Sequence, residues 1–297
     1  MQPPDEFIQF FSKIYGTRWP AIFSSLQGEE VQVARPNAFT PITEWNGEGE
    51  IPRAENGLLT HYVMDPASIE AAKALNVQVG DCVLDMCAAP GGKTLILAEA
   101  LGESGELIAN ELSEPRRERL KKVIQQYIPR NVRDHVFVTG KEGGRFAQVK
   151  AQYFDRVLVD APCSGERHQL GNRKELAQWT ESRSKKLAQR QYALLTAALL
   201  TAKPGARIVY STCSISPYEN DEVIAHLKKR KSSAFKVEKQ VEKQVEKQIE
   251  KLETSVLAKS SELSLAQNPA EPTEFGWQFL PDQHGWGPIY YCVLQVL

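Results

Sequence analysis

Short apolar runs alternate with helical segments between residues 81 and 214, and this alternation constrains the fold more than any other feature. The apolar runs expected to form strands are 81–88, 105–112, 135–140, 154–162 and 207–214. Helical spacing of apolar residues marks the segments 92–102, 114–128 and 183–202. Strands that are apolar almost throughout, separated by helices, indicate a parallel sheet covered by helices on both faces. The sequence therefore predicts an α/β fold, with 287–297 as a last edge strand.

The overall composition is that of a soluble globular chain. Of its 297 residues, 42% are hydrophobic and 25% charged, which allows one large domain with an appendage. The beginning, "MQPPDEFIQFF", has neither the pattern of a signal peptide nor that of a transit peptide. No apolar run approaches membrane-spanning length. We therefore expect a cytoplasmic protein without a membrane segment.

The cysteines and the net charge narrow the function classes. Five cysteines without a C-x-x-C pair suit neither a disulfide framework nor a zinc site, so we expect reduced thiols and no metal. A net charge of −1 argues against indiscriminate polyanion binding, although it leaves room for a local basic face.

Two segments stand outside the alternation. Residues 1–60 have aromatic and aliphatic residues at helical spacings, followed by a polar loop, and are predicted to form an N-terminal helical extension. The remaining 61–297 form the main domain. Within it, "VEKQVEKQVEKQ" repeats every four residues and predicts a charged helical insertion at about 232–262.

A glycine pair follows the first predicted strand, in "DMCAAPGGKT". Such a turn lets backbone N–H groups approach a ligand at a helix N-terminus. A phosphate-binding loop would need glycine where Cys87 stands, and G-x-G-x-x-G is absent, so the turn favours a nucleoside with a short cationic tail. Acidic residues end three other strands, at Glu111, Glu142 and Asp160. The carboxyl ends of parallel strands are where ligands bind, and Glu111 is placed to accept the ribose hydroxyls.

Thiols lie at or directly after the ends of two of the predicted strands, 154–162 and 207–214. Cys163 and Cys213 lie in the polar turns "DAPCSG" and "STCS". Cysteines that only pack in a core seldom have serine neighbours in a turn, so these two are candidate catalytic groups. Cys82 and Cys292 lie inside predicted strands and are expected in the core.

Together, "LDMCAAPGGKT", "VDAPCSG" and "VYSTCS" resemble the Sun family of S-adenosylmethionine-dependent RNA cytosine-C5 methyltransferases. The segments "FSKIYGTRWPAI" and "GPIYYCVLQ" look most like the branch that modifies mitochondrial small-subunit ribosomal RNA. The resemblance implies a Rossmann-like methyltransferase fold with a mostly parallel, seven-stranded sheet. It also implies transfer of a methyl group from S-adenosyl-L-methionine to C5 of cytosine.

The resemblance assigns roles to individual residues. Cys213 would be the nucleophile, Cys163 would assist product release, Asp160 would contact the cytosine edge and Lys93 would lie nearby. Glu111 would hold the ribose of the cofactor, with Arg116 beside it. The turn that would wrap the methionine and ribose consists of Cys87, Ala88, Ala89, Pro90, Gly91, Gly92 and Lys93. Glu142 and Gly143 would flank the adenine, and Asp160 borders the same cleft.

Both thiols can reach a base only when it has left its stack, so the RNA would be single-stranded or flipped. The segment after Cys163 supplies basic side chains and Trp179, which suit phosphate contacts and base stacking. The candidate RNA-binding residues are Arg167, Arg173, Lys174, Arg183, Lys185 and Lys186. The N-terminal extension is a further candidate RNA contact.

Three interpretations remain open from the sequence. The leading one is methylation of ribosomal RNA, with a ribosomal or assembly-factor partner. The second is the same chemistry on transfer RNA. The third is a non-catalytic RNA-binding assembly factor, which the two thiols, Asp160 and the glycine turn argue against.

Overall fold

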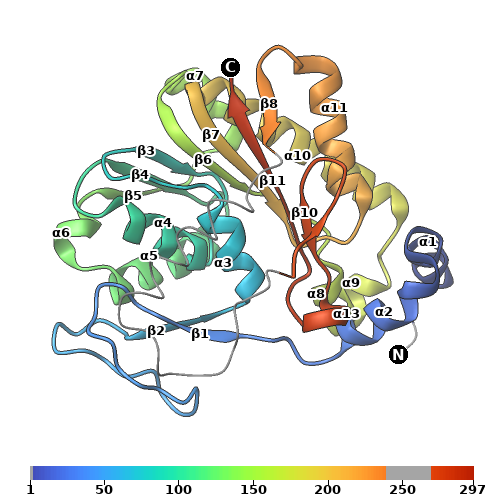
Figure 1. Cartoon of the computed structure of the whole chain (residues 1–297), viewed down its shortest axis with the longest axis horizontal. Helices are drawn as coiled ribbons and strands as arrows, with labels where there is room; N and C mark the ends of the chain where they lie inside the picture. Colours follow the sequence, from blue (N-terminus) through green and yellow to red (C-terminus); the bar gives the residue numbers. More distant parts are fainter. Residues whose placement is uncertain (1–2, 239–268) are drawn as a thin grey trace.

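The computed structural model describes residues 3–238 and 269–297, and its centre is one nine-stranded sheet (Figure 1). The strands run in the order β5-β4-β3-β6-β7-β11-β10-β9, and β8 pairs with β11. Their bounds are β3 Cys82–Asp85, β4 Glu106–Asn110, β5 Val136–Thr139, β6 Phe154–Asp160, β7 Ala202–Thr212, β8 Phe235–Glu238, β9 Glu271–Pro272, β10 Trp277–Phe279 and β11 Ile289–Val296. Neighbours from β5 to β7 are parallel, and every pair that involves β11 is antiparallel. The predicted α/β fold with a mostly parallel sheet is confirmed, with nine strands in place of seven, of which β9 has only two residues and β10 only three.

The placement of β11 corrects the prediction of an edge strand. β11 lies between β7 on one side and β8 and β10 on the other. The sequence "IYYCVLQV" shows why: seven of its eight residues are buried, on both faces of the sheet. A strand with one face to solvent alternates apolar and polar residues, whereas this run is apolar on both faces, as interior strands are.

Helices cover both faces of the sheet, in agreement with the prediction (Figure 1). Alternate residues of β7 show the two layers: Val209 packs on one side, Ile208 and Tyr210 on the other. The first face holds α3 (Pro66–Lys73), α4 (Gly92–Leu101) and α5 (Glu114–Tyr127). The second face holds α7 (Phe146–Val149), α10 (Glu181–Thr201) and α11 (Asp221–Lys231). The pair Asp65-Pro66 is typical of a helix start, and Asp65 caps α3 by accepting a hydrogen bond from the Ser68 amide.

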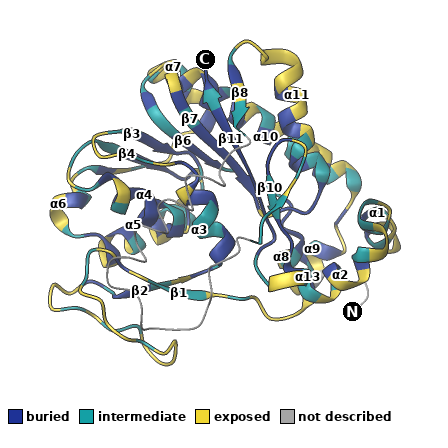
Figure 2. Ribbon diagram, viewed as in Figure 1, coloured by how far each residue is buried: buried dark blue, intermediate teal, exposed yellow. Residues whose placement is uncertain are grey.

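The N-terminal helices pack beside the sheet rather than on it (Figure 1). These are α1 (Asp5–Tyr15), η1 (Gly16–Arg18) and α2 (Trp19–Gln27). The chain then forms β1 (Val33–Pro36), which pairs antiparallel with β2 (His61–Met64), so the helical part of the predicted 1–60 extension ends at Gln27. Between these strands the chain from 41 to 50 is almost wholly exposed (Figure 2).

An aromatic cluster joins the N-terminal helices to the loops that follow β6 and β7. Phe7, Phe11 and Trp19 pack against Trp179 and Ile215. The short helices in these loops and near the C-terminus are α8 (Glu166–Gly171), α9 (Arg173–Leu176), η3 (Pro217–Glu219) and α13 (Pro281–His284). The remaining short helices are α6 (Arg130–Arg133) and η2 (Gly143–Arg145). Because Ile215 lies two residues after Cys213, the N-terminal helices support the turn that carries this thiol.

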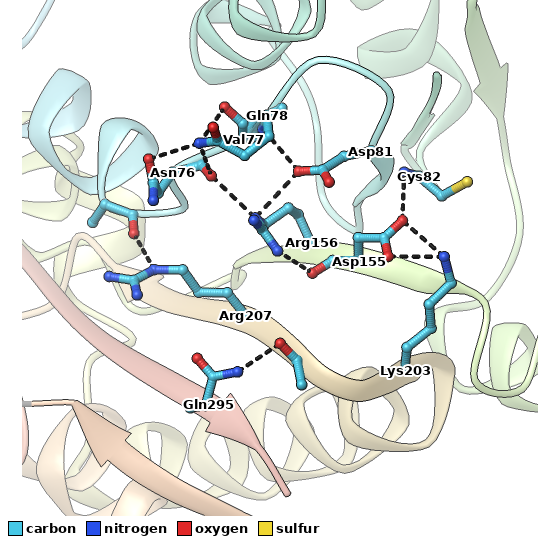
Figure 3. A network of polar contacts seen from close by, with 12 residues as sticks. Asn76, Val77, Gln78, Asp81, Cys82, Asp155, Arg156, Lys203, Arg207 and Gln295 are labelled. Atoms are coloured by element: carbon cyan, nitrogen blue, oxygen red, sulfur yellow. Dashed lines mark hydrogen bonds and ion pairs between the residues drawn. The ribbon is translucent and has the colours of Figure 1, made fainter. Parts of the chain in front are cut away.

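A polar network ties the amino ends of β3, β6 and β7 together (Figure 3). Lys203 Nζ lies 2.8 Å from Asp155 Oδ1, and Asp155 Oδ2 accepts a hydrogen bond of 2.9 Å from the Cys82 amide. Arg156 Nε donates to the Asn76 carbonyl oxygen and pairs with Asp81 at 3.3 Å. This network lies at the amino ends of the strands, on the opposite side of the sheet from their carboxyl ends.

The predicted insertion at 232–262 falls mostly on 239–268, outside the described residues. Across the described ranges, no helix combines the length and the apolar composition that a membrane span requires.

Candidate active site

The carboxyl ends of β3, β4, β5 and β6 surround a cavity of about 340 Å³. Five residues predicted to contact the cofactor line it: Cys87, Glu111, Arg116, Glu142 and Gly143. The other lining residues, which the sequence analysis did not assign to the cofactor, are Met86, Asn110, Leu112, Ser113, Lys141, Pro162, Arg190 and Leu194. Their signal in the sequence is position alone, since most of them neighbour a predicted residue or strand end.

Asn110 holds the edge of this cavity together. Its side-chain amide donates to the carbonyl oxygens of Met86, at 3.1 Å, and Lys141, at 2.9 Å. Its Oδ1 accepts from the Thr139 hydroxyl and the Lys141 amide. The buried Asn110 thus joins the ends of β3, β4 and β5, which fixes the shape of the cavity wall.

Glu111 offers an unsatisfied acceptor to the cavity. Its side chain is buried, and Oε1 accepts a hydrogen bond of 2.8 Å from the Ser113 amide. Oε2 has no hydrogen-bond partner and lies 3.4 Å from Arg116 Nη1. A buried carboxylate oxygen without a donor is costly, so a ligand with hydroxyl groups has an acceptor here.

The glycine turn shapes the cavity mainly through its backbone. Of its residues only Cys87 lines the cavity, while Ala88 and Ala89 are buried and Pro90 is exposed. Gly91 has φ +125°, and a Cβ there would lie 2.9 Å from Val123 Cγ1. A Cβ on Gly92 would lie 2.8 Å from the Tyr62 ring. The two glycines therefore allow α4 to begin close against α5 and β2.

Lys93 and Asp160 form an ion pair beyond the glycine turn. Lys93 Nζ lies 2.9 Å from Asp160 Oδ2, and the Ser211 hydroxyl donates to Asp160 Oδ1 at 2.7 Å. Burial alone would lower the pKa of Lys93, but the Asp160 carboxylate outweighs it and holds that pKa above its ordinary value. The ammonium group therefore stays charged, and one side of Asp160 is fixed.

A second buried acid lies behind this pair. Asp85, at the end of β3, accepts a hydrogen bond of 2.7 Å from the Thr94 hydroxyl, and its Oδ1 has no partner. Burial raises the pKa of Asp85 to about 7, with the nearby Asp160 adding to the effect. Asp85 thus holds a proton more readily than an ordinary aspartate.

The two predicted thiols lie together. Cys163 Sγ and Cys213 Sγ are 2.9 Å apart, and the Cys213 amide donates to Cys163 Sγ at 3.2 Å. Cys213 is exposed, whereas Cys163 is half-buried. The hydrogen bond with Cys213 and burial raise the pKa of Cys163 well above its ordinary value, so this thiol keeps its proton. The pair thus consists of one accessible thiol and one protonated neighbour.

A buried polar cluster that the sequence did not predict lies next to the thiols. Ser164 and Ser214 directly follow the two cysteines, and both contact Glu166 and Glu219. The two carboxyl groups are fully buried. The sequence gives little sign of this cluster because Glu166 and Glu219 look like ordinary polar loop residues.

The predicted RNA-binding residues divide into exposed and engaged groups. Lys174 and Lys186 are exposed, and Arg183 is half-exposed. Arg167 donates to the Ser25 carbonyl oxygen at 3.1 Å, and Lys185 pairs with Glu181 at 2.6 Å. The side chain of Arg173 is outside the described part of the structure.

Trp179 corrects one expectation. Its ring is only 3% exposed and lies 5.1 Å from that of Phe7, centroid to centroid. It belongs to the aromatic cluster with the N-terminal helices and is not a stacking surface for bases. The apolar pattern of α1 requires a partner, and Trp179 supplies part of it.

The family model of the 16S rRNA methyltransferases RsmB/F matches residues 72–295. The chain belongs to this family. The match includes the glycine turn, both thiols and the acids at the strand ends. The matched range contains the three motifs that carry the resemblance, and the suspected family is confirmed.

Curated relatives of this RsmB/F family member include methyltransferases named for ribosomal and for transfer RNA. The 5-cytosine rRNA methyltransferase NSUN4 of Mus musculus is 37% identical over 246 residues, which are 81% of this chain and 61% of the relative. NSUN4 of Bos taurus is 46% identical over 173 residues, 57% of this chain and 44% of the relative. The mitochondrial tRNA (cytosine(34)-C(5))-methyltransferase of Danio rerio is 39% identical over 171 residues, 56% of this chain and 46% of the relative. The chain thus spans between 44% and 61% of these relatives.

Solved structures share the fold of this RsmB/F family member. NSun6 from Pyrococcus horikoshii has a TM-score of 0.69 at 17% identity, over 98% of both chains. A methyltransferase homolog protein from the same organism has a TM-score of 0.69 at 20% identity, over 98% of this chain and 94% of that one. At these identities the likeness establishes the fold.

Proposed function

We propose that this protein transfers a methyl group from S-adenosyl-L-methionine to C5 of a cytosine in RNA. The observation that carries the proposal is the pair of thiols, 2.9 Å apart, one exposed and one protonated. Cytosine C5 is a poor nucleophile, and attack of a thiolate on C6 is a way to activate it. The membership of the RsmB/F family supports the same chemistry.

The cavity, which is lined by Pro162 one residue before Cys163, fits the cofactor. Its volume of about 340 Å³ falls within the range of small-molecule sites. The free Oε2 of Glu111 would accept hydrogen bonds from the ribose hydroxyls. Leu112, Pro162 and Leu194 supply apolar walls for the adenine. When bound, the cofactor supplies a methyl group on a positively charged sulfur, which makes that methyl electrophilic.

The two thiols and Asp160 each have one role in the proposed reaction. The Cys213 thiolate forms a bond to C6, and the electron pair of the C5–C6 double bond becomes available at C5, which accepts the methyl group. Water then takes the C5 proton, the electron pair of the C5–H bond re-forms the C5–C6 double bond, and Cys213 leaves as thiolate with the electron pair of the C6–S bond. Asp160 would contact the cytosine edge and support the charge on the ring, and its contacts with Lys93 and Ser211 support this role because they fix its carboxylate. Cys163, beside the departing sulfur, is the group that assists release.

Ribosomal RNA is the proposed substrate class. The relative that aligns with 81% of this chain and the relative that is 46% identical are both named for ribosomal RNA. Transfer RNA is the second candidate, because a relative with 39% identity is named for it. The exposed Lys174 and Lys186 are proposed to contact phosphates. A ribosomal or assembly-factor partner stays a prediction.

The test uses the Cys163→Ala protein, the cofactor and total cellular RNA, separated under denaturing conditions. If Cys163 assists release, this variant accumulates an RNA–protein adduct that survives denaturation, and adding Cys213→Ala abolishes it. Cys82→Ala is the matched control, since this half-buried thiol lies at the opposite end of the sheet. Absence of both an adduct and methyl transfer by the unmodified protein would contradict the proposal. Sequencing the trapped RNA separates the two substrate classes.

A further inference from the structure

Two buried acids connect the thiol-bearing turns. Glu166 lies at the start of α8, three residues after Cys163, and Glu219 ends η3, six residues after Cys213. Both side chains are fully buried. Glu166 Oε2 accepts a hydrogen bond of 3.0 Å from the Ile215 amide, and Glu219 Oε2 accepts one of 2.9 Å from the Ser164 amide. Each acid therefore bonds the backbone of the opposite turn.

The hydroxyl of Ser164 has more partners than it has hydrogens. Its Oγ contacts Glu166 Oε1, lies 2.6 Å from Glu219 Oε1 and lies 3.0 Å from Ser214 Oγ. A serine hydroxyl has one hydrogen to donate. If both carboxyl groups were ionised, the Ser164 hydrogen would bond only one of them. The other carboxylate oxygen would then face a lone pair of Ser164 Oγ, which is repulsive. A proton on one carboxyl group removes this conflict, because it donates to Ser164 Oγ, which then donates to the other acid.

The surrounding donors decide which acid holds the proton. Glu219 accepts from the Ser164 amide, from Gln191 Nε2 at 2.9 Å and from the Ser184 hydroxyl, which suits an ionised carboxylate. Glu166 Oε2 accepts an N–H bond from Ile215, and the backbone of Glu166 itself also contributes, but its Oε1 faces the hydroxyl oxygens of Ser164 and Ser214. Burial and the charge of Glu219 raise the pKa of Glu166 well above its ordinary value.

We propose that Glu166 is a positioning residue that, as a neutral carboxylic acid, locks the Cys163 turn to the Cys213 turn. The proposal rests on the proposed methyl transfer and names a residue that acts through the two thiols. When Glu166 loses its proton, two adjacent carboxylates repel each other and one short contact with Ser164 is lost. The turns then separate, the thiols leave their paired geometry and methyl transfer slows.

The other groups around Glu166 do not neutralise this charge. Glu219 on η3 and Tyr15 on α1 face Glu166, and both are acidic or neutral. Cys163 on the preceding turn and Tyr210 on β7 face Glu219 and are neutral. The helix α10 contributes the uncharged Ser184 and Gln191. Arg167 follows Glu166 in the chain, but its guanidinium donates to Ser25. Among the described residues, neither acid has a salt bridge.

The test compares the unmodified protein with Glu166→Gln from about pH 6 to about pH 9. Glutamine places a permanent N–H donor at Ser164 and keeps an acceptor for the Ile215 amide, so it imitates the neutral acid at every pH. The ratio of methyl transfer by Glu166→Gln to that by the unmodified protein is expected to rise about tenfold over this range, since small displacements of reacting groups cost this much. Taking the ratio removes every pH effect that is common to the two proteins.

Controls separate the positioning role from a general loss of structure. Glu222→Gln changes an exposed glutamate three residues from Glu219 and should give a flat ratio. Glu219→Gln places amide hydrogens among groups that already donate, so it should lower stability far more than Glu166→Gln. Equal effects of the two substitutions would overturn the assignment of the proton to Glu166.

Infrared difference spectra give a readout that does not need activity. The difference spectrum between the unmodified protein and Glu166→Gln should contain a band of a protonated carboxyl group, because the contribution of Asp85 is common to both proteins and cancels. An active protein with a flat ratio would overturn the positioning role while the proposed function stands. If the protein methylates no RNA, the proposed function fails, and absence of the band would overturn the proton on Glu166 independently.

Discussion

The hydroxyl of Tyr15 donates a hydrogen bond of 2.6 Å to the carbonyl oxygen of Ile215, two residues after Cys213. This bond connects the end of α1 to the turn that carries the proposed nucleophile. The N-terminal helices are therefore part of the support of the site, in addition to being candidates for RNA contact.

Replacing Tyr15 with Phe should impair both stability and activity. The change leaves a carbonyl without its donor, which costs about 1–3 kcal/mol of the free energy of unfolding. Because the turn loosens, kcat of methyl transfer should fall more than KM changes. Tyr153→Phe is the control: its hydroxyl contacts Glu106 at 2.6 Å, far from the site, so only stability should fall. Equal kcat values for the two variants would contradict the supporting role of Tyr15.

Replacing Lys93 with Met should abolish most of the activity at a modest cost in stability. Asp160 would lose the cation that fixes it and would stabilise the transition state less well. We expect kcat to fall by about a hundredfold. The loss of unfolding free energy should be about 1 kcal/mol, because Asp160 is 29% exposed and water can hydrate it. Lys203→Met removes a similar pair, with Asp155, at the opposite edge of the sheet and should leave kcat unchanged. Urea unfolding and single-turnover methyl transfer measure the two effects.

Asp85 should make stability fall as the pH rises. Its folded pKa of about 7 lies above that of the unfolded chain, so the folded protein binds more protons between about pH 4 and about pH 7. The contribution of Asp85 is fully present below this window and declines through it, by up to about 1.4 kcal/mol per pH unit. Denaturant unfolding across this range checks the slope. The Asp85→Asn variant keeps the contact with Thr94 and should flatten the dependence of the unfolding free energy on pH. An unchanged slope would contradict its assignment to Asp85.

Replacing Glu111 with Gln should weaken cofactor binding. The amide retains one acceptor but loses the charge, so the ribose hydroxyls would bind less strongly, by about 1.5–3 kcal/mol. Calorimetric titration with S-adenosylhomocysteine measures this without any turnover. Glu114→Gln, at the exposed start of α5, should bind as the unmodified protein does. Equal affinities for all three proteins would exclude Glu111 from the ribose site.

The sequence predicted the parts of the molecule that have a local signature. Apolar runs predict β3 to β7 because buried parallel strands need no polar alternation, and Asp65-Pro66 predicts the start of α3. The predicted strand 81–88 shortens to Cys82–Asp85 because the chain must turn there to line the cavity.

The parts that escaped prediction depend on long-range contacts. Glu166 and Glu219 are 53 positions apart and become a buried pair only when β6 and β7 lie side by side. Trp179 resembles a surface aromatic among basic residues until α1 packs on it. No local pattern distinguishes these residues from loop residues in contact with solvent.

The interior place of β11 has a consequence for how the chain acquires its structure during synthesis. β7 exposes a long open edge to the medium until residues 289–296 have left the ribosome, because only then can β11 pair with it. Pairing of distant strands is slow, and an unpaired edge invites association with other chains. The nascent polypeptide therefore completes its sheet only after residues 289–296 have become available, and until then the β7 edge is open to other chains.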